Sequence, residues 1–269
     1  MTTPKPKPLL LVLLALLAVV GTPTTAPWRT LPGWLAASAA ALVIDAPLLR
    51  WRTGRWQFPR GGLITAWLVA LIQSPYEPMW VAATAVGVGL ASKHVWRRGR
   101  VNVANPAAVG LVAVSVMTGA AQNWWGALAD VPPVAGWGLV LGVSVVVAAR
   151  VHKVPLALAF LGAFGATCTA ATFVVAPDQL AEVFVAPDLL ALILFAGVML
   201  TDPPTSPVAV SAQVWHGLLV GLLAAALLLE TTVTAPWLWA LLAGNLLEAW
   251  RRWRVDVATR RARPVPGHS

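Results

Sequence analysis

Apolar stretches with hardly any charge inside them recur along this chain, and this pattern constrains the fold more than any other feature. Charged residues make up 11% of the 269 residues, and hydrophobic residues make up 58%. A soluble domain carries about 25% charged residues, so this chain has too little polar surface to dissolve as a globule. We therefore expect an integral membrane protein whose main solvent is lipid.

The apolar stretches can be counted. A helix needs roughly 20 apolar residues to cross a bilayer, and backbone polar groups in lipid must find partners inside the protein. The candidate segments lie near 8–24, 33–49, 61–75, 78–95, 105–120, 134–150, 154–176, 186–201, 210–229 and 234–250. The sequence thus predicts an all-α integral membrane protein of about ten transmembrane helices. Two segments, 61–74 and 105–118, are short, and we expect half-helices that end inside the bilayer.

The basic residues give an independent test of this count, because Lys and Arg collect in cytoplasmic loops. With the N-terminus in the cytoplasm, 18 of the 19 basic residues fall in cytoplasmic segments and only Arg29 falls outside. This alternation requires the first apolar segment, which resembles a signal peptide, to be retained. We expect a multi-pass protein of the bacterial inner membrane with both termini in the cytoplasm. A single membrane domain covers 1–250, and an unstructured basic cytoplasmic tail covers 251–269.

The net charge of +9 is explained by this placement. The expected partner of the basic residues is therefore the lipid bilayer and not nucleic acid. No spacing of His, Cys and acidic residues indicates a metal site, and no nucleophile–base pair or nucleotide-binding loop is present. We assign no catalytic residues, and a self-contained hydrolase is not expected.

The first polar motif precedes a short apolar segment. Asn105 stands directly before Pro106, and these residue types suit the N-cap and first turn of a helix. Asn102 is not needed for that cap. An amide offers both a donor and an acceptor, so two asparagines facing the same way could grip a heterocycle. The two interpretations, a cap with a tight turn or a ligand site, both stay open.

The second polar motif follows the apolar segment at 186–201 and is interrupted by three prolines. It begins Thr201-Asp202 and includes Thr205. Irregular backbone at membrane depth must be buried in protein or line a cavity, and an acid there indicates function. The alternative is a helix terminator at the interface, whose aspartate meets cytoplasmic water.

Two further acids lie near predicted cytoplasmic helix ends. Asp45 precedes Arg50 by five residues, and we expect it to pair with a cytoplasmic arginine. Glu248 stands three and four residues before Arg251 and Arg252, a spacing that favours an ion pair on one helix.

The polar motifs belong to a wider resemblance. The chain resembles the family that contains the D subunit of the Rnf electron-transport complex and the B subunit of the sodium-pumping NADH:quinone oxidoreductase. The segments that carry it are 58–65 (FPRGGLIT), 92–94 (SKH), 102–107 (NVANPA) and 195–207 (FAGVMLTDPPTSP). The resemblance implies two inverted halves with short broken helices, a membrane-embedded flavin, electron transport, and other membrane or redox subunits as partners.

The resemblance also implies a site. Riboflavin or FMN would lie, non-covalently, near Asn102 and Asn105. Thr201, Asp202 and Thr205 would support the same cavity. The chain would then be a component of a membrane oxidoreductase or ion translocase.

One departure from the family is large. The family attaches FMN to a threonine in the outer segment that follows the Asn-Pro-Ala helix, but residues 119–133 contain no threonine. The similar triplet at 165–167 lies inside an apolar helix, where small residues suit helix packing. Covalent FMN is therefore not expected. Two alternatives remain: a small-solute or ion transporter or channel that uses the same cavity, and a structural membrane subunit that docks partner proteins.

Overall fold

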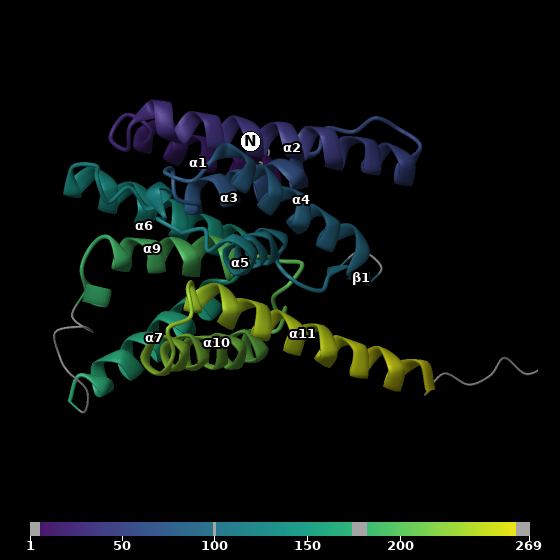
Figure 1. The fold of residues 1–269 in the computed structure, drawn as a ribbon. Coiled ribbons are helices and arrows are strands. Elements are labelled where there is room, and N and C mark those ends of the chain that lie inside the picture. Colours follow the sequence, from purple (N-terminus) through teal and green to yellow (C-terminus); the bar gives the residue numbers. More distant parts are fainter. Residues whose placement is uncertain (1–5, 99–100, 174–181, 262–269) are drawn as a thin grey trace, which may run out of the picture.

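The computed structural model describes residues 6–98, 101–173 and 182–261 (Figure 1). Within these ranges the chain is helical apart from its connections and one small hairpin. The hairpin pairs β1 (Arg97–Arg98) with β2 (Val101–Asn102) in antiparallel fashion, and Arg97 faces Asn102. The strand β2 ends four residues before the next helix, which begins at Pro106.

Helices occupy all the apolar segments expected from the sequence, as far as the described ranges extend. The first half contains α1 (Pro6–Gly21), α2 (Pro27–Thr53), α3 (Arg60–Ile72), α4 (Met79–Val95) and α5 (Pro106–Thr118). The second half contains α6 (Pro133–Arg150), α7 (Val154–Ala171), α9 (Asp188–Leu194) with η3 (Phe195–Met199), α10 (Val210–Glu230) and α11 (Pro236–Arg261). Short 3-10 turns, η1 (Trp125–Ala127) and η2 (Glu182–Phe184), lie in the connections.

Several of these helices suit a bilayer by length and composition. Among the described residues, α2, α6, α7 and α10 are long and apolar enough to cross a membrane, while α1, α3, α5 and α9 with η3 are apolar but shorter. Large apolar side chains such as Val43, Val145 and Trp215 are exposed on the outside of the helices. Such exposure suits contact with lipid. The chain is therefore an all-helical membrane protein.

The helices α3 and α5 are the short segments expected from the sequence. Each has 13 residues, a length of about 20 Å, which is less than the roughly 30 Å of a hydrocarbon core. Beyond their ends the chain pairs with itself: Gln73 bridges Gln122, and the Ile72 carbonyl accepts from the amides of Asn123 and Trp124. The irregular backbone thus finds its hydrogen-bond partners inside the protein, as burial away from water requires.

A third broken helix leads into the second polar motif. After Leu194, α9 widens into the π-helical η3, where the Leu200 amide donates to the Phe195 carbonyl. Gly197 makes room for this turn, since a Cβ there would meet the Ser144 side chain of α6. Such π-turns often mark functional sites. This helix ends immediately before Thr201.

Three packing contacts of the first half have counterparts in the second half. In the first half α2 packs on α4, α4 on α5 and α1 on α3. In the second half α7 packs on α10, α10 on α11 and α6 on α9 and η3. Figure 1 shows α1 to α4 on one side of the molecule and α7, α10 and α11 on the other, with α5, α6 and α9 between them. Small residues allow close crossings: a Cβ at Gly217 or Gly221 of α10 would meet backbone carbonyls of α7.

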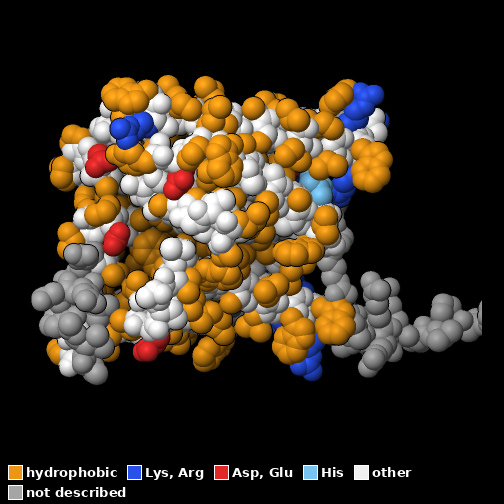
Figure 2. Space-filling view, viewed as in Figure 1, with side chains coloured by type: hydrophobic (Ala, Val, Ile, Leu, Met, Phe, Trp, Pro, Cys, Tyr) orange, Lys and Arg blue, Asp and Glu red, His pale blue; other side chains and the backbone are white. Residues whose placement is uncertain are grey.

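The charged side chains separate to opposite ends of the helices. In Figure 2, Lys and Arg gather mainly at the end where β1 and the last turns of α11 lie, whereas Asp and Glu gather at the other end. Hydrophobic side chains cover most of the surface between the two ends. This is the asymmetry that the alternation of basic loops predicts.

The C-terminal region differs from the expectation. We expected an unstructured tail from Arg251, but α11 continues without interruption to Arg261. A straight continuation lets Arg251 and Arg252 stay within reach of Glu248 one turn earlier. Residues 262–269 of the expected tail lie beyond the described chain.

Candidate functional site

A cavity of about 470 Å³ opens where the two polar motifs meet. Its walls come from the first turns of α1, from α3, the end of α4, β2 with the start of α5, the end of α6, and the turn after η3. Asn102, Asn105 and Asp202 all line it. Residues about 100 positions apart in the sequence therefore share one site.

Asn105 builds the start of α5. Its side-chain carbonyl accepts from the amides of Ala107 (3.0 Å) and Ala108 (3.2 Å), so it is the N-cap that the sequence predicts. Its side-chain amide donates to the Met199 carbonyl at 3.3 Å. The side chain is buried, and its bond to the Met199 carbonyl ties α5 to η3. Asn105 therefore shapes the cavity wall while its polar atoms serve the fold.

Asn102 is differently placed. It lies in β2, is half-buried, and lines the cavity. Within the described part of the chain, its side chain makes no hydrogen bond that we observe. Its amide can therefore offer both a donor and an acceptor to a ligand.

The second motif forms a tight turn. The Thr201 hydroxyl donates to the Gly197 carbonyl at 2.6 Å, and the Thr205 hydroxyl donates to Asp202 Oδ2 at 3.1 Å. The amide and the hydroxyl of Ser206 both donate to the Asp202 carbonyl. Thr201 and Thr205 are buried behind the wall. They support the turn, and Asp202 is the member of this group that faces the cavity.

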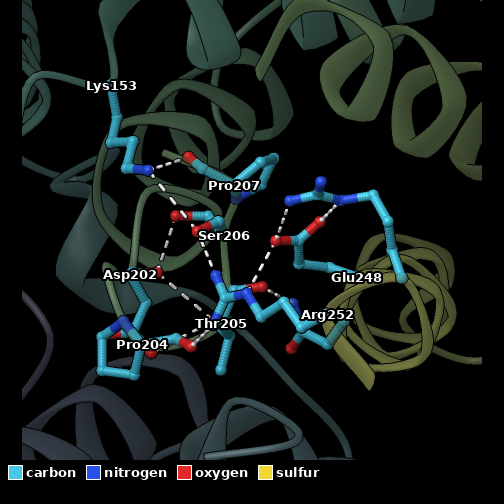
Figure 3. A network of polar contacts seen from close by, with 10 residues as sticks. Lys153, Asp202, Pro204, Thr205, Ser206, Pro207, Glu248 and Arg252 are labelled. Atoms are coloured by element: carbon cyan, nitrogen blue, oxygen red, sulfur yellow. Dashed lines mark hydrogen bonds and ion pairs between the residues drawn. The ribbon is translucent and has the colours of Figure 1, made fainter. Parts of the chain in front are cut away.

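Two basic residues clamp this turn from outside (Figure 3). Arg252 of α11 donates to the carbonyls of Pro204 (2.8 Å) and Ser206 (2.6 Å). Lys153, between α6 and α7, reaches the carbonyls of Ser206 and Pro207 from the other side of the turn. Burial lowers the pKa of Lys153. The sequence marks Lys153 as a topology signal and Arg252 as a partner of Glu248, and nothing local indicates that either residue binds a distant turn.

Asn245 links the two polar motifs directly. Asn245 of α11 accepts from the Asn105 amide through Oδ1 at 2.9 Å and donates to the Thr205 carbonyl through Nδ2 at 3.4 Å. On the same helix, Glu248 pairs with Arg251 and Arg252 at 2.7 Å each, as predicted. The start of α5 and the turn after η3 are thus held in one hydrogen-bonded assembly.

Asp45 is not paired with an arginine, so that expectation was wrong. The buried carboxylate accepts from Lys93 Nζ at 2.9 and 3.0 Å, and it lies 2.9 Å from His94 Nε2. It also accepts from the Gly62 amide at the start of α3. Helix packing brings α4 beside α2 at this depth, which places Lys93 nearer to Asp45 than the arginines at the helix end. Lys93 in turn lines the cavity.

The cavity wall carries more positive than negative charge. Lys7, Lys93 and Arg150 line it, against the single acidic residue Asp202 among the described lining residues. Burial raises the pKa of the Asp202 carboxyl to about 6, although the Thr205 hydroxyl and the nearby lysines Lys7 and Lys153 act in the opposite direction. Burial therefore makes the ionised form of Asp202 less favourable in the folded protein than in the unfolded chain.

Asp202→Asn is expected to stabilise the protein near pH 7.5 by about 2 kcal/mol, a figure reduced for the partial exposure of this residue. The folded protein holds the Asp202 proton more tightly than the unfolded chain, so wild-type stability falls as the pH rises from about 4 to about 6. The substituted amide keeps an acceptor for Thr205 but carries no charge. Thermal unfolding followed by tryptophan fluorescence should show the gap between variant and wild type closing toward pH 4. Asp130→Asn, at an exposed aspartate, is the control, and an equal gap at all pH values would contradict the prediction.

The structure brings the five predicted site residues together in two roles. Asn102, Asn105 and Asp202 line the cavity, and Thr201 and Thr205 hold the turn behind it. The sequence did not predict Lys7, Lys93 and Arg150 as site residues, although they line the cavity.

Within the described ranges, no group of three His, Cys, Asp or Glu side chains could hold a metal ion. No known protein-family model and no curated protein matches this chain.

Proposed function

We propose that this protein is an RnfD/NqrB-like membrane subunit that holds a non-covalent flavin in the cavity and takes part in electron transfer. One observation carries the proposal. Each of the segments behind the resemblance contributes to the cavity wall: Gly61, Ile64 and Thr65 from the first, Lys93 from the second, Asn102 and Asn105 from the third, and Asp202 from the fourth. Segments that resemble a flavin-binding family thus converge on one space.

The residues present suit a flavin. Apolar side chains such as Ile64, Leu68 and Val147 offer a surface for a ring system. Asn102 offers donor and acceptor atoms for the polar edge of that ring. The start of α5 adds the partial positive charge of a helix N-terminus. The flavin would supply the redox chemistry, and the chain would position it and limit its contact with water.

The proposed topology has ten spans in two inverted halves of five helices, with both termini in the cytoplasm of a bacterium. The repeated packing pattern supports the two halves, since five spans per half reverse the orientation of the second half. The separation of charge supports the orientation. Broken helices that meet near a site are common in such inverted repeats. Other membrane or redox subunits would supply and remove the electrons.

The visible spectrum of the purified protein tests the proposal. We expect near-stoichiometric flavin absorption that is released on denaturation, as fits a non-covalent cofactor. Asn102→Leu should lose the flavin, whereas Asn123→Leu, at an exposed asparagine near the opposite end of the helices, should keep it. Asn105 is a poor choice for this test because its substitution would also remove the cap of α5. A folded but colourless wild-type protein would refute flavin binding. It would favour the alternative, in which the cavity belongs to a transporter or channel for a small solute or ion.

A further inference from the structure

A groove of about 960 Å³ lies between α7, α10 and α11, on the side of the molecule opposite α1 to α4 (Figure 1). The described residues that line it include none of those that line the cavity at Asp202. Along α10 the lining extends from Ala212 to Ala226, a rise of about 21 Å. The hydrocarbon of one leaflet is about 15 Å deep, half of a bilayer core. The groove is therefore long enough to hold a lipid chain through one leaflet.

The polar groups that can bind a ligand lie at one end of this groove. His216 stands near the start of α10, and Glu248 and Arg251 stand near the basic end of α11. Leucine and alanine side chains make up most of the remaining wall. The hydroxyl of Thr167, farther along, donates to the Ala163 carbonyl of its own helix. An occupant would therefore meet polar groups at one end and an apolar wall along its body.

Arg251 keeps hydrogen-bond donors that Glu248 does not use. Its Nε donates to Glu248 Oε2 at 2.7 Å, and its Nη2 donates to Oε1 at 2.9 Å. A guanidinium carries five N–H groups, so the others can serve a ligand, and the side chain is exposed. Glu248 also accepts from Arg252 Nε at 2.7 Å, so one carboxylate balances two guanidinium groups. This end of the groove therefore has both a net positive charge and free donors.

His216 is buried in the groove wall without a partner. We observe no hydrogen bond between its imidazole and any described residue, and its Nε2 is fully enclosed. Nε2 lies toward α11, where a Cβ at Gly244 would be 3.1 Å away. Gly244 precedes Glu248 by four residues, so the imidazole lies about one helical turn deeper than the ion pair. A buried polar atom without a partner is unfavourable, and a ligand atom here would complete its bonding.

We propose that this groove binds one anionic phospholipid of the cytoplasmic leaflet. The lipid phosphate binds the free N–H groups of Arg251, since arginine binds phosphate through charge-assisted hydrogen bonds. An ester carbonyl, deeper in the groove, accepts from His216, and an acyl chain lies along Leu219 and Leu222. The net positive charge at the polar end favours an anionic lipid over a zwitterionic one. The site does not depend on the flavin, and only its leaflet follows from the proposed topology.

The test compares two lipids that differ only in the headgroup. The full-length protein is delipidated in mild detergent and titrated with phosphatidylglycerol or phosphatidylcholine of the same acyl chains, and bound lipid is counted by native mass spectrometry. We expect one phosphatidylglycerol to bind about tenfold more tightly than phosphatidylcholine at low salt, with a smaller difference at high salt. Equal affinities for the two lipids, or binding of neither, would overturn the proposal. Either result would leave the proposed flavin function intact, because flavin content is measured separately.

The variant Arg251→Gln locates the headgroup. Glu248 keeps its bond to Arg252 in this variant, so the end of α11 retains one ion pair. Phosphatidylglycerol affinity should fall about tenfold to that of phosphatidylcholine, and unchanged phosphatidylcholine binding shows that the variant is folded. Arg55→Gln removes an exposed charge outside the groove and should keep the preference of the wild type. If Arg251→Gln behaves like Arg55→Gln, the assignment of the phosphate to Arg251 is wrong.

The variant Leu222→Trp locates the acyl chain. Leu222 is an exposed residue of α10 that lines the groove, so an indole there would fill the groove without entering the protein core. We expect both lipids to bind several-fold more weakly. Leu42→Trp, at an exposed leucine of α2 outside the groove, is the matched control and should bind both lipids as the wild type does. Unchanged binding by Leu222→Trp would show that the lipid lies elsewhere and would overturn the proposal.

Discussion

Asp45→Asn is expected to destabilise the folded protein by about 3–5 kcal/mol, because removing one partner leaves a buried charge uncompensated. Asp45 is fully buried and is the carboxylate that Lys93 and His94 both contact. Asparagine can still accept from the Gly62 amide and from one lysine hydrogen, but it cannot balance the charge of Lys93. Since Lys93 also lines the cavity, flavin content should fall together with stability.

Thermal unfolding followed by the intrinsic fluorescence of the 15 tryptophans measures this effect. The double variant Asp45→Asn with Lys93→Gln should recover part of the loss, since both charges are then removed together. Asp130→Asn, at an exposed position, should leave the midpoint unchanged. A midpoint for Asp45→Asn equal to that of the wild type would show that the buried pair does not stabilise the helices α2 and α4.

Gly110→Ala is expected to be the second damaging change. The helices α4 and α5 cross so closely at Gly110 that a Cβ there would collide with the Ala85 carbonyl oxygen and approach the Gly89 amide nitrogen to 3.3 Å. Overpacking of this kind typically costs about 1–3 kcal/mol because neither backbone can move without disturbing its neighbours. The shift would displace the start of α5, so bound flavin should be lost even in molecules that remain folded.

Gly142→Ala in α6 provides the matched control, since a Cβ at Gly142 has nothing within 4 Å. Alanine there removes chain entropy from the unfolded state and should be neutral or stabilising by up to about 1 kcal/mol. The measurements are the unfolding midpoint and the flavin-to-protein ratio. Equal behaviour of the two alanine variants would mean that the close crossing of α4 and α5 does not limit the fold.

Much of the architecture was predictable because it depends on local composition. Apolar stretches must become helices in lipid, and the helices found at 60–72 and 106–118 agree with the short segments expected there. The cap at Asn105 and the pairing of Glu248 with Arg251 and Arg252 were also predictable. The cap and the ion pairs each depend on residues within four positions of one another, so sequence spacing decides whether they form.

The partners of distant charges were not predictable. Asp45 has arginines nearby in sequence but binds Lys93, because the packing of α4 on α2 sets which cation reaches the buried carboxylate. In the sequence Lys153 looks like a topology signal and Arg252 like a partner of Glu248, yet both also hold the turn after η3 through its carbonyl oxygens. No local pattern reports a bond between residues about 50 positions apart.

The order of apolar and charged residues therefore decides that this chain enters a membrane, where its helices lie, and which of their ends carry positive charge. Tertiary packing alone decides that Asn102 and Asp202 face the same cavity and that Lys7 and Arg150 stand at its edge. The physical reason is the distance along the chain over which each effect acts. Solvation in lipid acts on each segment separately, whereas a cavity exists only where several segments fail to fill the space between them.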